Sequence, residues 1–210
     1  MTPPIAIVLA AGEGRRMGGP KALLLVDGEP LLLRHVRRLR EAGCGPIVVV
    51  ARGSNAGLMR QLLSAFSGVQ VRRADTASMA GSLRVALGCV ALRSGRSVVV
   101  SPVDVLPARV STLHSLLHAV TLPDLLVATP RYRAQGGHPV VARDRLFQTF
   151  LDGRGGTLRD LLRNVEAQRC RVDVDDPAVV SALDTPADLA AHRPGLAPQF
   201  ARPIAADASA

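Results

Sequence analysis

A glycine-rich, positively charged segment follows the first apolar run of the chain, and it carries the residue types best suited to chemistry. The run Ile5–Ala10 leads directly into AGEGRRMGGPK, which spans residues 11–21. Glycines allow several backbone N–H groups to point at one anion, while Arg15, Arg16 and Lys21 supply positive charge. The pattern predicts a loop that binds a polyphosphate. The alternative is a tight strand-to-helix turn whose arginines are solvated.

Two well-known phosphate-binding loops do not fit this segment. A Walker A loop requires Gly-Lys-Ser/Thr, whereas Lys21 follows Pro20 and precedes Ala22. A dinucleotide-binding loop requires a helix that opens at its third glycine and an acidic residue at the end of the next strand. Pro20 interrupts such a helix, and the next long apolar run ends at Ala51-Arg52. Lys21 is also the only lysine among the 26 lysine and arginine residues of the chain.

Two aspartates are candidates for binding a metal ion. The apolar run that starts at Val98 ends in Ser-Pro-Val-Asp104, and a parallel strand would deliver this carboxylate to the edge that holds the glycine-rich loop. Carboxylate oxygens suit Mg²⁺, which also takes phosphate oxygens and water; the alternative role of Asp104 is a turn cap. Asp184, two residues before Pro186, is either a second metal ligand or a helix cap. Three other acids are expected to be solvated: Asp173, Asp175 and Asp176.

Apolar runs alternate with amphipathic stretches along the chain, which is the pattern of βαβ units in a parallel sheet. Strands are predicted at Ile5–Ala10, Ile47–Ala51, Val69–Arg73, Val98–Ser101, Leu125–Thr129 and Cys170–Val174. Helices are predicted at Pro30–Ala42, Ala56–Ala65, Ser82–Leu92, Val110–Val120, Arg143–Leu151, Leu158–Asn164 and Pro186–His192. Because crossover connections are right-handed, these elements predict a Rossmann-like, three-layer α/β/α sandwich with a mostly parallel sheet. Ligands are expected at the carboxyl ends of its strands.

The length and composition favour one compact domain rather than a membrane protein. The chain has 210 residues, of which 48% are hydrophobic and 20% charged, and we expect a domain over residues 1–193. Residues 194–210 are rich in Pro, Ala and Gly without periodicity, which predicts a flexible tail. No apolar run approaches the ~20 residues of a membrane-spanning helix, and the N-terminus lacks the basic region of an export signal. These features predict a cytoplasmic protein with no membrane partner.

The formal net charge of +9 raises the alternative of a nucleic-acid-binding protein. The arginines are spread over predicted helices and loops, and aromatic residues make up only 2% of the chain, which leaves few platforms on which bases could stack. A protein that binds small phosphate anions explains the charge equally well. We therefore expect no nucleic-acid partner.

The glycine-rich segment resembles the signature of the nucleotidyltransferases. Residues 9–18, LAAGEGRRMG, followed by Pro20-Lys21, are similar to the pattern L-A-A-G-x-G-x-R-M-G-x-x-K, and the chain most resembles the MobA/MocA-like group, closest to the molybdenum cofactor cytidylyltransferases. The resemblance continues at Ala22–Pro30, Met79–Arg84, Pro102–Asp104, Gly137–Pro139 and Leu183–Leu189. It implies a glycosyltransferase-A-like fold. It also implies that an acceptor phosphate attacks the α-phosphorus of a nucleoside triphosphate (NTP) and releases pyrophosphate.

The resemblance assigns roles to individual residues. Arg16 and Lys21 would neutralise charge on the reacting triphosphate and, with Asp104, form the catalytic set. Asp104 and Asp184 would hold Mg²⁺. Besides Lys21, the nucleotide would contact Leu9, Ala10, Ala11, Gly12, Gly14, Arg15, Gly81 and Ser82.

On the acceptor side the resemblance is weaker. His138 belongs to the Gly-His-Pro element near the acceptor, where it either binds the acceptor phosphate or hydrogen-bonds the loop. Arg154 stands where relatives commonly have an acid, and Ala182 replaces another acid of the pattern. We expect His138 and Arg154 to contact the acceptor, since an arginine would favour an anionic molecule such as a phosphorylated pterin.

The resulting functional hypothesis is a Mg²⁺-dependent cytidylyltransferase that transfers CMP from CTP to molybdopterin or its molybdenum form. CTP is favoured because Ala11 has a methyl group where the guanylyl branch has a second glycine, and this methyl takes space that a purine would use. A molybdoenzyme or its chaperone is a candidate partner. The alternatives are a nucleotidyltransferase for another acceptor, such as a GTP-using guanylyltransferase or an enzyme of sugar or alcohol phosphates, and a non-catalytic nucleotide-binding module. Lys21 together with Asp104 favours an enzyme, because binding alone does not need a metal-binding acid.

Overall fold

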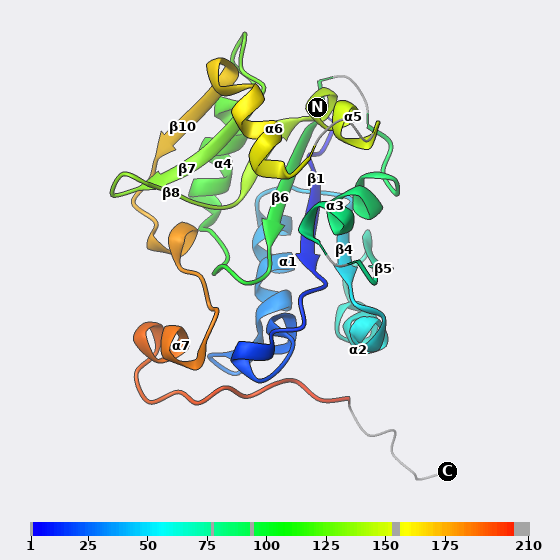
Figure 1. The fold of residues 1–210 in the computed structure, drawn as a ribbon, viewed down its shortest axis with the longest axis vertical. Helices are drawn as coiled ribbons and strands as arrows, with labels where there is room; N and C mark the ends of the chain where they lie inside the picture. The colour runs from blue at the N-terminus through cyan, green and yellow to red at the C-terminus, as the bar shows by residue number, and fades with distance from the viewer. Residues whose placement is uncertain (1, 77, 93–94, 153–155, 204–210) are drawn as a thin grey trace.

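A mixed sheet forms the centre of the fold (Figure 1). The computed structural model describes residues 2–76, 78–92, 95–152 and 156–203. Within them, strands pair in the order β10-β7-β9-β6-β1-β4-β5, and β8 pairs with β7. The strands are β1 (Ile5–Ala10), β4 (Ile47–Ala51), β5 (Val69–Arg73), β6 (Ser97–Pro102), β7 (Val127–Tyr132), β8 (Gln135–Gly136), β9 (Val140–Arg143) and β10 (Arg169–Asp173).

Most of the pairings in this sheet are parallel, as predicted. β1 pairs in parallel with both β4 and β6, β5 extends the sheet beyond β4, and β10 pairs in parallel with β7. Both faces of β1 are covered: Ala6 and Val8 belong to one apolar cluster, while Ile7 and Leu9 belong to the other. A strand buried on both faces has no polar side, which is why β1 and β4 are continuous apolar runs in the sequence.

Helices cover the two faces of the sheet and confirm the three-layer α/β/α prediction. The helices α1 (Leu31–Glu41), α2 (Gly53–Leu63) and α4 (Val110–Ala119) pack on one face, with α7 (Pro186–His192) in the same cluster. The helices α3 (Met79–Leu87), α5 (Asp144–Leu151) and α6 (Leu158–Asn164) pack on the other face, which is turned toward the viewer in Figure 1. None of the described helices has the length and apolar character that crossing a bilayer requires.

The strand β9 was not predicted. It lies antiparallel between β6 and β7. Of its four residues, only Arg143 had been assigned to an element, the helix predicted at Arg143–Leu151. That helix, α5, begins at Asp144 directly after the strand. A four-residue apolar run next to a helix shows too little periodicity to separate the two elements.

The limits of helix α3 also differ from the prediction. The helix was expected at Ser82–Leu92, but it begins at Met79 and ends at Leu87. Ser78 is its N-cap and accepts a hydrogen bond from the backbone N–H of Gly81 at 3.1 Å. Ser82 therefore lies inside the helix, where its side chain is buried.

Within the described residues, the segment that follows residue 194 forms backbone hydrogen bonds with the chain near residues 23–25. The backbone N–H of Leu25 donates to the carbonyl of Gln199 at 2.7 Å, and the N–H of Ala201 donates to the carbonyl of Leu23 at 2.8 Å. Residues 23–25 lead into a hairpin of β2 (Leu25–Val26) and β3 (Glu29–Pro30) that was not predicted either. The part of the predicted tail from 204 to 210 lies outside the described residues.

Candidate active site

A cavity of about 410 Å³ opens at the carboxyl ends of β1, β4 and β6. It contains most of the residues singled out in the sequence, because parallel strands end at one edge of the sheet. The predicted nucleotide-binding, catalytic and metal-binding residues that line it are Leu9, Ala11, Gly12, Gly14, Arg15, Arg16, Lys21, Ser82, Asp104 and Asp184. Residues not predicted also line it: Glu13, Arg52, Thr76, Ser78, Met79, Pro102 and Val103.

Two predicted nucleotide-binding residues are absent from the described lining of this cavity. Ala10 is buried in the cluster on the α1 face of the sheet, opposite to Leu9 and Ala11. Gly81 packs against Thr76, whose Cβ would lie 2.9 Å from a β-carbon added to the glycine. Gly81 thus provides space for Thr76, and Thr76 reaches the cavity with its hydroxyl 2.9 Å from that of Ser82.

The glycine-rich loop folds back on itself through Gly14. This residue has φ +66°, and a β-carbon added to it would lie 1.9 Å from the carbonyl oxygen of Gly19. Both facts require glycine. Two short 3₁₀ turns follow, η1 (Arg15–Met17) and η2 (Lys21–Leu23), and the fully buried Met17 anchors the first. The loop thus leaves Arg15 exposed while Lys21 lies inside the cavity.

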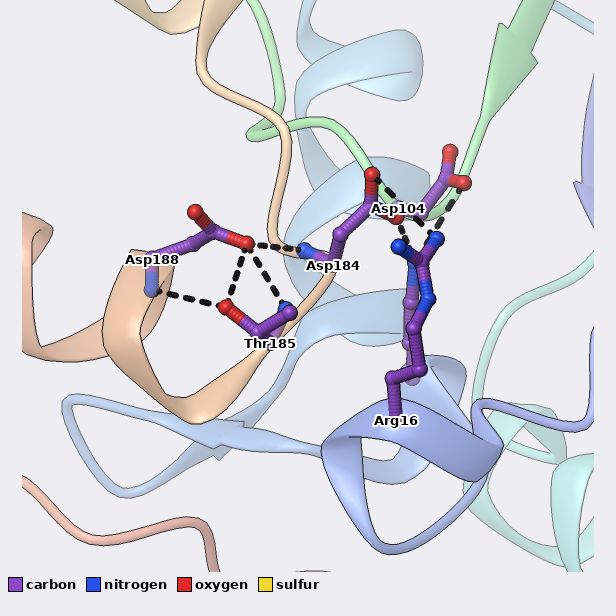
Figure 2. A network of polar contacts seen from close by, with 6 residues as sticks. Arg16, Asp104, Asp184, Thr185 and Asp188 are labelled. Atoms are coloured by element: carbon purple, nitrogen blue, oxygen red, sulfur yellow. Dashed lines mark hydrogen bonds and ion pairs between the residues drawn. The ribbon is translucent and has the colours of Figure 1, made fainter.

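Lys21 lies between two carboxylates that come from distant parts of the chain. Its Nζ is 2.5 Å from Oδ1 of Asp184 and 3.5 Å from Oδ2 of Asp104, and its side chain is 14% exposed. The Nη2 atom of Arg16 lies 3.8 Å from Oδ2 of Asp184. Figure 2 shows the guanidinium of Arg16 turned toward this carboxylate. Two positive and two negative side chains therefore converge at the end of the glycine-rich loop.

Backbone pairing brings the two carboxylates together. The N–H of Leu183 donates to the carbonyl of Asp104 at 2.7 Å, and the N–H of Leu106 donates to the carbonyl of Ser181 at 3.0 Å. Between these bonds, Val105 and Ala182 form an isolated antiparallel bridge. Asp184 is thus held beside Asp104 although 80 positions of sequence separate them (184 − 104).

The structure separates the two roles considered for Asp184. The N-cap of α7 is Thr185, which forms a capping box with Asp188. The Asp188 carboxylate accepts hydrogen bonds from the N–H groups of Asp184 and Thr185 at 3.0 and 2.7 Å (Figure 2). The Thr185 hydrogen bonds hold the pKa of Asp188 below its ordinary value. Because Thr185 and Asp188 cap the helix, the side chain of Asp184 is left to face Lys21.

A buried histidine supports the chain that follows Asp104. His35 of α1 is 2% exposed; its Nε2 lies 2.8 Å from the carbonyl oxygen of Val105, and its Nδ1 lies 3.2 Å from Oγ of Ser101. A neutral ring satisfies both contacts by donating from Nε2 and accepting at Nδ1. Burial lowers the pKa of His35 to about 4. No local pattern in the sequence connects this helical histidine with Asp104.

The lowered pKa of His35 predicts a loss of stability at acid pH. The unfolded chain takes up the proton near pH 6.5, whereas the folded chain resists it down to about pH 4, so the free energy of unfolding falls across that interval. The decrease in the free energy of unfolding caused by protonation of His35 is about 3 kcal/mol over this interval. In the variant His35→Gln, which keeps a neutral donor and acceptor, denaturant unfolding between about pH 7.5 and about pH 4 should show a smaller pH dependence. Equal pH dependence in both proteins would contradict a neutral buried His35.

An ion pair that was not predicted borders the other end of the cavity. Nη1 of Arg52 lies 3.0 Å from Oε1 of Glu13, and its Nε donates to the carbonyl of Ala11 at 3.3 Å. Arg15 also pairs with Glu13, and this hydrogen bond lowers the pKa of the Glu13 carboxyl. Arg52 directly follows β4, so the rule that ligands meet strand ends could have found it.

A second cavity of about 240 Å³ adjoins the first and shares Met79, Pro102 and Asp104 with it. His138 lines this cavity; its backbone N–H donates to the carbonyl of Val179 at 2.8 Å. Among the described residues its buried Nδ1 has no hydrogen-bond partner, and burial lowers the pKa of the ring. Arg154, the other predicted acceptor residue, lies outside the described residues.

One supposedly solvated acid supports the wall of this second cavity. Asp176 is buried; its Oδ2 accepts hydrogen bonds from the N–H of Arg109 at 2.7 Å and the hydroxyl of Thr112 at 2.8 Å. It also caps the 3₁₀ turn that contains Val179. The expectation that Asp176 is solvated is therefore wrong. Sequence patterns could not indicate its burial, because its partners at the start of α4 are distant in sequence.

Comparison with known proteins agrees with this geometry. The glycine-rich loop and the two carboxylates lie at the carboxyl edge of a mostly parallel sheet, and the fold is that of the nucleotidyltransferases, of the glycosyltransferase-A-like type. Residues 6–172 match the family model of the MobA-like NTP transferase domain, and the chain belongs to that family.

Among curated proteins, the chain is 40% identical over 97 residues to a probable molybdenum cofactor guanylyltransferase of Opitutus terrae, a match that covers 46% of each chain. It is 34% identical over 120 residues to 2-C-methyl-D-erythritol 4-phosphate cytidylyltransferase of Geobacillus thermodenitrificans, covering 54% of this chain and 51% of that protein. The chain thus spans about half the length of these relatives. Their names differ in both the nucleotide and the acceptor.

Among solved structures, Rv0371c of Mycobacterium tuberculosis is 26% identical with a TM-score of 0.73, covering 91% of this chain and 98% of that one. A structure of the same mycobacterial protein in complex with manganese matches at 25% identity and a TM-score of 0.69, covering 90% and 96%. The similarity to this protein extends over almost the whole of both chains.

Proposed function

We propose that this protein transfers a nucleoside monophosphate, by preference CMP from CTP, to a phosphorylated acceptor of the molybdopterin type and releases pyrophosphate. The observation that carries the proposal is the position of Lys21. The only lysine of the chain is held inside a cavity, at the end of a glycine-rich loop, between Asp104 and Asp184. A half-buried ammonium of this kind serves as a point charge for phosphates.

In the proposed reaction an oxygen of the acceptor phosphate forms a bond to the α-phosphorus of the NTP. The bond from this phosphorus to the bridging oxygen breaks, and pyrophosphate leaves with the bonding electrons. Catalysis of this type depends on positioning and on cations at the oxygens that gain charge. Lys21 and Arg16, both at the cavity, would supply that charge, and backbone N–H groups of the glycine-rich loop would orient the triphosphate.

The residues at the cavity fit a bound Mg²⁺. Mg²⁺ is held in such sites by one or two carboxylates together with phosphate oxygens and water, and Asp104 and Asp184 are two partly exposed carboxylates that meet at one point. The mycobacterial relative was solved in complex with manganese, which supports the proposal that this protein also binds a divalent ion. When bound, the ion would neutralise charge on the triphosphate.

The acceptor would occupy the second cavity. That cavity adjoins the first at Asp104, so a phosphate placed there lies next to the reacting end of the NTP. His138 would donate a hydrogen bond to the acceptor phosphate from its ring, whose Nδ1 lacks a partner within the described chain. Arg154 is proposed to add a positive charge. The Opitutus relative's name supports a molybdenum pterin as acceptor, and a molybdoenzyme or its chaperone would then receive the product.

The preference for CTP depends on Ala11. This residue lines the cavity on the same face of the sheet as Leu9 and Ser82, so its methyl group narrows the space for a base. We expect kcat/KM for CTP to exceed that for GTP by about tens-fold, the discrimination typical of one small apolar group. In Ala11→Gly the ratio should shift toward GTP.

The control for this prediction is Ala10→Gly, which removes the neighbouring methyl group from the opposite face of β1. That variant should keep the native ratio of kcat/KM for the two nucleotides. GTP preferred by the native protein, as the name of the Opitutus relative suggests, would assign the guanylyl reaction instead. Equal shifts in both variants would show that the methyl of Ala11 does not contact the base.

A further inference from the structure

The chain near its described C-terminal limit crosses the segment that follows Lys21. Gln199 and Ala201 form backbone hydrogen bonds with Leu25 and Leu23, and Phe200 forms an antiparallel bridge with Leu24. In Figure 1 this segment runs beneath the N-terminal loop after passing α7. We call residues 199–201 the crossing segment.

The ring of Phe200 rests against the glycine-rich loop. A β-carbon added to Gly19 would lie 2.9, 3.0 and 3.1 Å from three atoms of the ring. Gly19 is also in contact with Gly14: the N–H of Gly19 donates to the carbonyl of Gly14 at 3.2 Å. The ring, Gly19 and Gly14 therefore form a stack, with Gly14 on the side that lines the cavity.

We propose that Phe200 is a positioning residue, which holds the glycine-rich loop and Lys21 in the arrangement that binds a triphosphate. This inference rests on the proposal above that the loop binds the phosphates of an NTP. It also extends the functional unit beyond the boundary predicted at residue 193, because the crossing segment lies outside that boundary.

A glycine-rich loop is better prepared to bind phosphates when a neighbouring side chain holds its backbone in place. Glycines lose more conformational freedom on ordering than other residues, and a loop that is ordered before binding spares the ligand that cost. The phosphates must approach the loop from the cavity, so the support has to come from the other side. The half-buried ring of Phe200 is placed there, next to the two backbone hydrogen bonds of the crossing segment.

The test compares Phe200→Ala with the conservative variant Phe200→Leu. Titration calorimetry with CTP and GTP, and with CMP and GMP, separates phosphate contacts from base contacts. We expect Phe200→Ala to bind the triphosphate about tenfold more weakly and to bind the monophosphate with little change, while Phe200→Leu retains most of the affinity. The control is Phe66→Ala, which removes another half-buried ring from the same apolar cluster, where it contacts Arg40. A general loss of packing would affect both alanine variants alike.

A double-mutant cycle tests the contact with Gly19 directly. The β-carbon of Gly19→Ala should displace the ring and weaken triphosphate binding in the native background. In the Phe200→Ala background the same change should have little further effect, because the space is then free. Additive effects of the two substitutions would overturn the proposed stack.

The possible failures can be told apart. If the native protein binds neither triphosphate, the proposed function fails, and hydrogen exchange at the amides of Gly14 and Gly19 still decides whether Phe200→Ala loosens the loop. If the native protein binds a triphosphate and Phe200→Ala binds it equally well, the positioning role is overturned. Faster exchange at these amides in Phe200→Ala, together with unchanged exchange in Phe66→Ala, is the expected result.

Discussion

Lys21→Ala is expected to lower kcat for nucleotidyl transfer by about 100- to 1,000-fold, the loss typical of one charge-stabilising group aimed at the transition state. The substitution removes the ammonium that lies between Asp104 and Asp184. Without it, the two carboxylates face each other and also face the incoming triphosphate. The affinity for NTP should therefore fall as well. Steady-state kinetics of pyrophosphate release measure the changes in kcat and in KM for the NTP. Melting temperatures show whether the variant keeps its fold.

A matched control for Lys21→Ala is Arg60→Ala, which removes a positive charge from the exposed side of α2. The net charge of the two variants is the same, so a general electrostatic effect would appear in both. Near-native kcat in a well-folded Lys21→Ala protein would remove Lys21 from the mechanism.

Asp104→Asn should abolish most metal-dependent turnover, with a loss of about 100-fold or more in kcat, because the amide is a weaker ligand than a carboxylate for a hard cation. Asn has almost the same shape, and the backbone bond from Leu183 to the carbonyl of residue 104 is kept. NTP binding measured without metal should change little. Titration of activity with Mg²⁺ and Mn²⁺ is the measurement.

Asp173→Asn serves as the control for Asp104→Asn, since Asp173 is an exposed carboxylate that pairs with Arg131 on the surface. It should leave the metal titration unchanged. An unchanged titration in Asp104→Asn itself would mean that the metal ion is bound elsewhere.

The central sheet and the position of the glycine-rich loop follow from local sequence. β1 and β4 are continuous apolar runs, and the rule for parallel strands correctly placed Lys21 and Asp104 at one edge. The same reasoning left two roles open for Asp184, a second metal ligand or a helix cap, because both are compatible with its position before Pro186. The structure gives the cap to Thr185 and Asp188. The backbone bridge between Val105 and Ala182 places Asp184 beside Asp104, and no local pattern indicates that bridge.

The features that were missed depend on contacts between distant segments. His35 is an ordinary helical residue by sequence, yet it meets the carbonyl of Val105. Asp176 belongs to a polar turn, yet α4 buries it. Phe200 lies in a region of low periodicity, yet its ring contacts Gly19. In each case the partner lies more than 60 positions away (105 − 35, 176 − 112, 200 − 19), beyond the range in which periodicity and capping rules operate.

The most direct test of the account is pyrophosphate release by the native protein with Mg²⁺ and each of CTP, GTP, UTP and ATP, with and without molybdopterin. The products are analysed for a nucleotidylated pterin. The account predicts that release requires both the NTP and the pterin, is fastest with CTP, and is lost in Lys21→Ala. Release that is absent with all four nucleotides, or that proceeds equally well without the pterin or without Lys21, would contradict it.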